Sequence, residues 1–195
     1  MAAFRPQSRR EPEKPIVAAH RGIRAHSVWL SLLKLAHAVL LTADPALVLR
    51  ELNVSEAPAY YALLDRNRAH LTQFGNYQAE GKATLAWVKR SLKRPGAGLR
   101  FGLWYSGELV GRIELAAWAQ HRFTLAYWLG SEHVGRGLMT HALTRLMQHG
   151  RESFGATAFF AGVTHGNSRS VAVLRGLGYE IAIDHCDHTV FSRVA

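Results

Sequence analysis

The sequence predicts a mixed α/β fold of the α+β kind, in which a mainly antiparallel, twisted central sheet is flanked by helices. Three observations support this prediction. Apolar strand patterns alternate with helical patterns from residue 47 to the end of the chain. Ser106-Gly107 separates two strand patterns, as the turn of a hairpin does. At residues 127–144 a short apolar strand runs into a glycine-punctuated turn and then into a helix.

The individual elements follow from local patterns along the chain. Strands are predicted at residues 47–52, 99–105, 108–116, 122–129, 157–163, 179–183 and 189–193. Helices are predicted at residues 55–64, 84–92, 139–154 and 168–177. Ser55 is the expected N-cap of the first helix, and Leu85, Val88 and Leu92 share one face of the second.

The first 43 residues differ from the rest, so the predicted division is a basic N-terminal extension at 1–43 and one domain at 44–195. Residues 1–15 are rich in Arg, Glu, Pro and Lys, which predicts disorder. Residues 28–41 are apolar apart from Lys34 and His37, which predicts a short amphipathic helix. This run is shorter than the ~20 residues that cross a bilayer, and Lys34 argues against a signal peptide.

Composition agrees with one domain in the cytoplasm. The chain has 195 residues, of which 48% are hydrophobic, enough for one buried core. The single Cys186 excludes an intrachain disulfide and suits a reducing compartment. Residues 185–188 (HCDH) are the only dense group of metal-binding residue types, and no second ligand pair stands at a recognisable spacing. We therefore expect no metal site.

The net charge of +10 bears on the choice of partner. Half of the excess positive charge lies in residues 1–50, and the other half lies in residues 51–195. The densest cluster of the domain surrounds residues 95–98 and consists of Lys89, Arg90, Lys93, Arg94 and Arg100. Such a cluster is able to bind the phosphate of a cofactor, an acidic protein or RNA. It is equally compatible with a solvated helix end, where cations are favourable.

The turn at residues 134–139 has the properties of a phosphate site. Gly135 and Gly137 permit positive φ and a close approach of the backbone, so free N–H groups are able to converge on an anion at the helix N-terminus. Arg136 adds a cation, and the Thr140 hydroxyl lies one turn into the helix. The spacing matches neither the dinucleotide fingerprint nor the phosphate loop of nucleotide-binding proteins. A pyrophosphate-bearing cofactor is the expected occupant.

Three segments together resemble the acyl-CoA-binding core of GNAT-superfamily acetyltransferases, most closely the RimJ/RimL-like branch. They are YWLGSEHVGRGLMTHALTRLM from residue 127, NSRS at 167–170 and LGYE at 177–180. The resemblance extends from about Leu49 to the C-terminus. In that family the motif Q/R-x-x-G-x-G/A supplies backbone amides to the coenzyme A pyrophosphate, and residues 132–137 match it with Glu at the first place. The resemblance implies a GNAT fold with splayed middle strands and acetyl-CoA as the cofactor.

The resemblance also assigns residues to the cofactor. Backbone N–H groups near Trp128 to Gly130 would polarise the thioester carbonyl, and the turn at 134–140 would hold the pyrophosphate. Asn167 and Ser170 match family positions near the pantetheine and the thiol. The full predicted set is Trp128, Leu129, Gly130, Val134, Gly135, Arg136, Gly137, Leu138, Met139, Thr140, Asn167 and Ser170.

The reaction that the resemblance implies is direct attack of a primary amine on the thioester in a ternary complex. This chemistry needs a neutral amine, an aligned carbonyl and a hydrogen-bond donor for the leaving thiolate. Ser170 is the predicted donor, and the alternative is that it only serves the first turn of its helix.

The predicted base departs from the family pattern. Relatives carry Glu in E-[LI]-G-Y-W, whereas this chain has Thr124 at that place. If the hairpin turns near residue 119, Glu114 lies opposite Thr124, within ~5.5 Å between the Cβ atoms, and takes over as the catalytic base. His121 and Tyr127 are alternative bases. Glu114 is also compatible with a structural role on an outward-facing position of its strand. An amine that arrives deprotonated needs no base.

The acceptor side also departs from the family. The loop between residues 183 and 187 is much shorter than in relatives, which predicts an open acceptor groove suited to a protein N-terminus or another large acceptor.

Three functional classes remain open. The first is an acetyl-CoA-dependent N-acetyltransferase acting on a protein N-terminal amine or a small amine. The others are a GNAT-fold enzyme that uses aminoacyl-tRNA or acts on tRNA, and a non-catalytic acyl-CoA-binding module. Monomer and homodimer are both compatible with the sequence.

Overall fold

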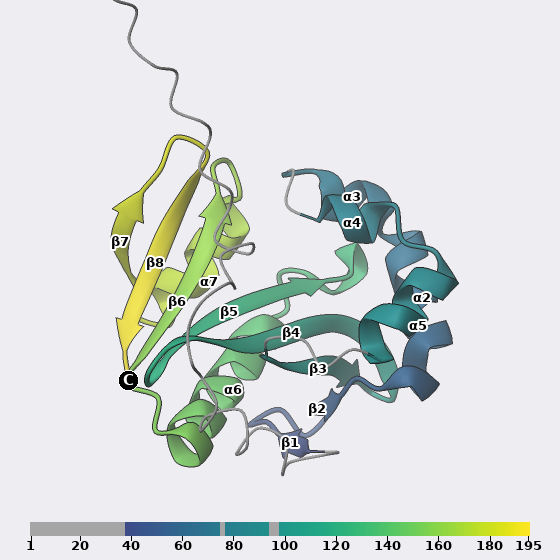
Figure 1. The fold of residues 1–195 in the computed structure, drawn as a ribbon, viewed down its shortest axis with the longest axis horizontal. Coiled ribbons are helices and arrows are strands. Elements are labelled where there is room, and N and C mark those ends of the chain that lie inside the picture. The colour runs from purple at the N-terminus through teal and green to yellow at the C-terminus, as the bar shows by residue number, and fades with distance from the viewer. Residues whose placement is uncertain (1–37, 75–76, 94–97) are drawn as a thin grey trace, which may run out of the picture.

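One twisted sheet of eight strands organises the part of the chain that the computed structural model describes, residues 38–74, 77–93 and 98–195 (Figure 1). The strand order is β1-β2-β3-β4-β5-β6-β8-β7. The strands are β1 Val39–Leu41, β2 Leu47–Glu51, β3 Gly98–Tyr105, β4 Glu108–Ala119, β5 Arg122–Leu129, β6 Ala158–Thr164, β7 Glu180–Asp184 and β8 His188–Val194. All neighbouring strands are antiparallel except β5 and β6, which are parallel. The predicted mainly antiparallel sheet is confirmed.

Helices lie on both faces of the sheet (Figure 1). They are α2 Ala57–Arg66, α3 Arg68–Thr72, α4 Gln78–Gly81, α5 Leu85–Lys93, α6 Leu138–Phe154 and α7 Ser168–Gly176, with short 3-10 turns η2 Val54–Glu56 and η3 Ser131–His133. On one face α6 and α7 bury Leu143 and Leu174 against sheet residues such as Ile113. On the other face α2 and α5 bury Tyr60 and Val88 in a second cluster.

Every strand and helix predicted from residue 47 onward is present, with ends within three residues of the prediction. Three local predictions were wrong or incomplete. Residues 39–41 form strand β1 and pair with β2, where the end of an apolar helix was expected. Residues 1–37, which make up most of the predicted extension, lie outside the described residues. Ser55 does not cap α2, which begins without a side-chain cap. Asn53 instead caps the preceding turn η2: its side chain accepts from the Ser55 N–H, while Glu56 accepts from the Asn53 N–H. Helices α3 and α4 were not predicted.

The turn between β4 and β5 corrects the predicted register. Strand β4 continues to Ala119, and His121 adopts a φ of 56° in the turn. A register shift between Ala117 and Ala119 leaves Trp118 as an extra residue. Glu114 therefore lies opposite Ala126, and Thr124 lies opposite Ala116.

Candidate active site

Strands β5 and β6 separate in the middle of the sheet. Their parallel pairing covers only Arg122–Thr124 of β5 and Ala158–Phe160 of β6. Beyond that point β5 continues for five residues to Leu129, and β6 continues to Thr164, without pairing to each other. Figure 1 shows the two strands diverging on the side where α6 begins. The splay that the sequence predicted is therefore present.

A cavity of about 460 Å³ opens at this splay. Its wall includes eleven of the twelve residues predicted to contact the cofactor, and the exception is Gly130. The wall also includes residues that were not predicted to contact the cofactor, from the α3–α4 region, from β5 and from α7. They are His70, Leu71, Phe74, Tyr77, Tyr127, Arg169, Ala172 and Val173. Tyr127 had been considered only as an alternative base.

The glycine turn forms the outer end of the cavity. Gly135 and Gly137 have φ values of 77° and 75°, which other residues rarely adopt. A Cβ on either glycine would meet no protein atom within 4 Å, so the space above the turn is open. Helix α6 begins at Leu138 without a side-chain cap. Its first N–H groups have no partner inside the helix and, together with the helix dipole, favour an anion at this place.

Arg136 is held beside this turn by its neighbours. Its guanidinium carbon lies 4.7 Å from the centroid of the Tyr105 ring, and its Nη1 lies 3.3 Å from His133 Nδ1. The side chain itself is exposed. A cation held beside the uncapped helix end adds to the favourable potential for an anion.

The edge of β5 that faces the splay carries free main-chain donors. The Tyr77 hydroxyl donates to the Tyr127 carbonyl oxygen at 2.9 Å, whereas the Gly130 N–H donates to the Val110 carbonyl of β4 at 2.8 Å. The N–H and C=O of one strand residue point to the same edge of the strand, and successive residues point to opposite edges. Because the Tyr127 carbonyl faces the splay, the N–H groups of Tyr127 and Leu129 also point into the splay. The predicted contribution of the Gly130 amide is wrong, because that amide is occupied by the sheet.

Asn167 and Ser170 meet this edge from the other side of the splay. Asn167 is the N-cap of α7, and its Oδ1 accepts a hydrogen bond from the Ser170 N–H at 3.2 Å. Ser170 therefore stands in the first turn of α7, where a purely structural role would place it, and it also lines the cavity. The two interpretations of Ser170 are compatible.

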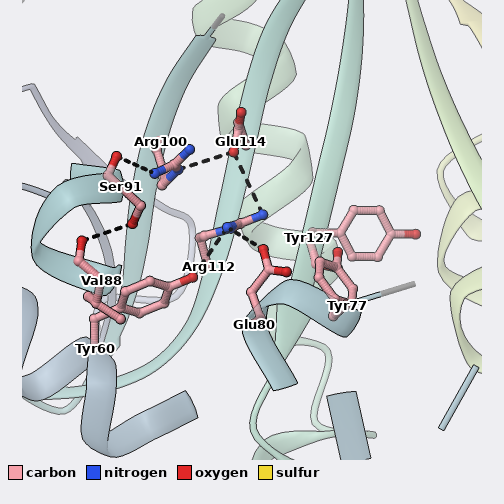
Figure 2. Close-up of polar contacts among 9 residues, drawn as sticks. All are labelled: Tyr60, Tyr77, Glu80, Val88, Ser91, Arg100, Arg112, Glu114 and Tyr127. Atoms are coloured by element: carbon pink, nitrogen blue, oxygen red, sulfur yellow. Dashed lines mark hydrogen bonds and ion pairs between the residues drawn. The ribbon is translucent and has the colours of Figure 1, made fainter. Parts of the chain in front are cut away.

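Polar residues on the sheet face opposite α6 form a connected network beside the splay (Figure 2). Arg112 is 7% exposed and donates to the Tyr60 hydroxyl at 3.2 Å and to Glu80 at 3.3 Å. Its Nη2 lies 3.7 Å from Glu114 Oε2. Burial alone would lower the pKa of Arg112, but Tyr60, Glu114, Tyr77 and Glu80 raise it above its ordinary value. Arg112 is therefore a permanent buried cation.

Glu114 is a member of this network, and not the neighbour of Thr124 that the sequence suggested. Its Oε2 accepts from Arg100 Nε at 3.2 Å and also faces Arg112. Its Oε1 has no hydrogen-bond or ion-pair partner among the described residues. Thr124 lies two residues further toward the turn, and its Oγ1 donates to the Ala116 carbonyl at 3.4 Å.

Other residues considered from the sequence lie elsewhere. His121 is in the β4–β5 turn, where its carbonyl accepts from Thr157, and it does not line the cavity. Lys89, Arg90 and Lys93 lie on α5, on the opposite side of the sheet from α6; Arg94 is outside the described residues. Among residues 38–74, 77–93 and 98–195, no group of three His, Cys, Asp or Glu side chains is placed to hold a metal ion. No helix in these ranges has the length and apolarity of a membrane span.

A split sheet with free strand amides leading to an uncapped, glycine-preceded helix is the architecture of acyl-CoA-dependent transferases, and sequence comparison agrees. The chain belongs to the acetyltransferase (GNAT) domain family, whose model matches residues 46–180. The family predicted from the sequence is confirmed. No curated protein matches the chain in sequence.

Solved structures share the fold at low sequence identity. RimL, a ribosomal L7/L12 α-N-protein acetyltransferase in complex with coenzyme A, has a TM-score of 0.73 and 19% identity over 80% of this chain and 98% of its own. RimJ from Mycobacterium smegmatis in complex with CoA-disulfide has a TM-score of 0.67 and 22% identity over 82% and 87%. The microcin C7 self-immunity acetyltransferase MccE, in complex with acetyl-CoA and AMP, has a TM-score of 0.68 and 18% identity over 78% and 94%. The predicted RimJ/RimL-like fold is confirmed.

Proposed function

We propose that this protein transfers an acetyl group from acetyl-CoA to a primary amine by direct attack. The observation that carries the proposal is the continuous wall from the uncapped N-terminus of α6 to the free amide edge of β5, through one cavity. A long donor with a pyrophosphate at one end and a carbonyl at the other matches those two ends. Similar structures that contain coenzyme A or acetyl-CoA support this choice of donor.

Each wall residue then has a chemical role. The turn at Gly135 and Gly137, with Arg136, binds the pyrophosphate. The Tyr127 and Leu129 N–H groups donate to the thioester carbonyl, which gains negative charge as the amine attacks. Ser170 donates to the sulfur. Acetyl-CoA supplies the activated acyl group, and no residue of the chain needs to carry the acetyl group covalently.

Glu114 is the proposed proton acceptor for the attacking amine. It lies on the face of β4 opposite α6 and is paired with Ala126, and therefore lies close to the point where β5 and β6 separate. Arg100 and Arg112 fix one carboxylate oxygen and leave Oε1 free. The carboxylate is thus oriented as a general base must be, and it also attracts a cationic amine.

The proposed acceptor is the N-terminal amine of a protein. The turn between β7 and β8 spans only residues 185–187, which leaves this side of the sheet without a long covering loop. RimL is a ribosomal L7/L12 α-N-protein acetyltransferase, which supports a protein acceptor. The complex of MccE with acetyl-CoA and AMP supports a small-molecule acceptor as the alternative. We propose a cytoplasmic location, in agreement with the exposed free thiol of Cys186.

Calorimetric titration with acetyl-CoA tests the donor site. We expect micromolar binding by the wild type and its loss in the double variant Gly135→Asp/Gly137→Asp, because carboxylates at these positions repel the pyrophosphate. Gly107→Asp is the matched control, since Gly107 also has a positive φ, 86°, but lies in the β3–β4 hairpin. Absence of acetyl-CoA binding by the wild type would contradict the proposed function.

A non-catalytic acyl-CoA-binding module is the second candidate, because the family glutamate is replaced by Thr124 and Glu114 is engaged by two arginines. Transfer to a panel of N-terminal peptides and small amines separates the two candidates. Catalysis predicts turnover that falls roughly 10²-fold or more in Glu114→Gln, with acetyl-CoA affinity unchanged. Tight binding without turnover on any acceptor supports the module.

A further inference from the structure

The Tyr127 hydroxyl is a buried polar group that the fold leaves without a partner. Tyr127 belongs to the part of β5 that no longer pairs with β6, and its side chain lines the cavity. Its hydroxyl oxygen is inaccessible to solvent and accepts or donates no hydrogen bond among the described residues. Figure 2 shows the ring pointing away from the Arg112 network. Because buried hydroxyls are nearly always paired, this hydroxyl is available to a group that binds against the part of the cavity wall formed by Tyr127.

A second hydroxyl, that of Ser170, approaches from the opposite side of the splay. Its main chain is fixed by the bond to Asn167, and its side chain lines the same cavity as Tyr127. The nearby Ser170 side chain lowers the pKa of Tyr127, although the two hydroxyls do not form a hydrogen bond of standard geometry. The two hydroxyl-bearing side chains, one from β5 and one from α7, are therefore neighbours in the wall of one cavity.

We propose that the Tyr127 hydroxyl is a catalytic hydrogen-bond donor to the sulfur of the acyl thioester, acting together with Ser170. This inference rests on the proposed function and adds a residue to it. The neighbouring N–H groups of Tyr127 and Leu129 point to the carbonyl end of the thioester. One short strand segment would thus serve both the carbonyl oxygen and the leaving sulfur.

The chemistry balances without any further reactant. The amine nitrogen forms a bond to the carbonyl carbon, and the carbon–sulfur bond breaks with its electron pair moving to sulfur. The thiolate accepts hydrogen bonds from Tyr127 and Ser170, the surplus proton of the amine passes to Glu114 or water, and water protonates the departing thiolate. Burial raises the pKa of Tyr127; the Ser170 side chain lowers it by a smaller amount, and the nearby Tyr77 raises it further. The phenol therefore stays protonated and donates a hydrogen bond without losing its proton.

The pKa of the coenzyme A thiol, measured on the protein, tests this role without knowledge of the acceptor. The thiolate absorbance of bound coenzyme A is followed against pH in the wild type, Tyr127→Phe and Tyr179→Phe. Tyr179 is the matched control, because it is a buried tyrosine whose hydroxyl donates to Met147 Sδ at 3.0 Å and does not line the cavity. We expect Tyr127→Phe to raise the thiol pKa by roughly one unit, as loss of a hydrogen bond to a charged group implies, and Tyr179→Phe to leave it unchanged.

Steady-state kinetics with a competent acceptor provide a second measurement. Tyr127→Phe should lower kcat about tenfold or more while the KM for acetyl-CoA stays within about twofold, because the donor acts on the departing sulfur. The combined variant with Ser170→Ala should lose less than the product of the two single losses, since both donors serve one atom.

The possible outcomes separate this inference from the function on which it rests. Coenzyme A binding with the same thiol pKa in the wild type and Tyr127→Phe overturns the role of Tyr127 and leaves the proposed function standing. An equal shift in Tyr179→Phe also overturns it, because the effect would then be general to buried tyrosines. Failure of the wild type to bind coenzyme A overturns both.

Discussion

The Tyr77 hydroxyl donates a hydrogen bond of 2.9 Å to the main-chain carbonyl of Tyr127, fifty residues further along the chain. Tyr77 immediately precedes α4, and Tyr127 lies on β5 beyond the point where β5 leaves β6. A strand edge that has lost its neighbour needs other partners for its carbonyls. Tyr77 supplies one, so the α4 region holds the edge of β5 in place while leaving its N–H groups free.

Replacement of Tyr77 by Phe should therefore affect both stability and donor binding. The Tyr127 carbonyl loses its partner, which should lower the free energy of unfolding by about 1–2 kcal/mol. The affinity for acetyl-CoA should fall several-fold, because the adjacent amides are less well fixed. Urea denaturation and calorimetry measure the two effects. Tyr105→Phe is the control, since the Tyr105 hydroxyl has no hydrogen-bond partner among the described residues and its ring remains under Arg136; equal losses in both variants would contradict this role.

The buried cation Arg112 should contribute strongly to the stability of the fold. Arg112→Met leaves Glu80 and Glu114 without their shared buried partner, and removal of one member of such a pair costs about 3–5 kcal/mol. Arg66→Ala is the control, because the Arg66–Glu108 pair is close, at 2.6 Å, but 43% and 56% exposed. An exposed pair contributes about 1 kcal/mol or less. Similar costs for the two variants, measured by urea denaturation, would exclude a special role for the Arg112 network.

His149 predicts a pH dependence of stability. It lies on α6 between the rings of Phe101 and Phe154, and burial lowers its pKa from 6.5, with Arg145 nearby adding to the effect. A base with a lowered pKa in the folded state stabilises the fold above its unfolded pKa, and this contribution is lost as the pH falls through the folded pKa. Stability should therefore fall below about pH 6.5. The slope should be smaller in His149→Gln, which urea denaturation at pH 5 and pH 7.5 measures; an unchanged slope would assign the effect to other histidines.

The outer end of the donor site could be predicted from sequence because its signals are local. Gly135 and Gly137 need only their own φ values, and the uncapped helix follows directly after them. Tyr77 could not be predicted in the same way. Its role depends on a partner fifty residues away, and the short helices α3 and α4 carry only one buried apolar residue, Leu71, so they have no periodic pattern.

The register of Glu114 could not be predicted for a different reason. His121 adopts positive φ in the β4–β5 turn without being Gly, Asn or Asp, and Trp118 forms a bulge that the sequence does not mark. The Trp118 ring packs against Phe160 of β6, with centroids 4.7 Å apart. A tertiary contact therefore accompanies the shift, and a two-residue error in the turn moved Glu114 away from Thr124. The side chain stayed on the predicted face, because a shift of two residues preserves the alternation of a strand.

Gly111 allows β4 and β5 to pack closely together, because a larger residue would clash with Trp128 and Leu129 of β5. A Cβ at Gly111 would lie 2.5 Å from the Trp128 carbonyl oxygen and 2.8 Å from the Leu129 side chain, so Gly111→Ala must push β5 away from β4. Such overpacking costs about 1–3 kcal/mol, and it displaces the strand segment whose Leu129 N–H faces the splay. We expect lower stability together with weaker acetyl-CoA binding.

Gly176 in α7 offers a matched substitution with the opposite expected sign. A Cβ there meets no atom within 4 Å, so Gly176→Ala should stabilise the helix by roughly 0.5–1 kcal/mol and leave acetyl-CoA binding unchanged. Thermal denaturation and calorimetry on both variants give the comparison. If Gly111→Ala lowers stability but binds acetyl-CoA like the wild type, the position of β5 is not what sets donor affinity, and the binding energy then comes mainly from the glycine turn before α6.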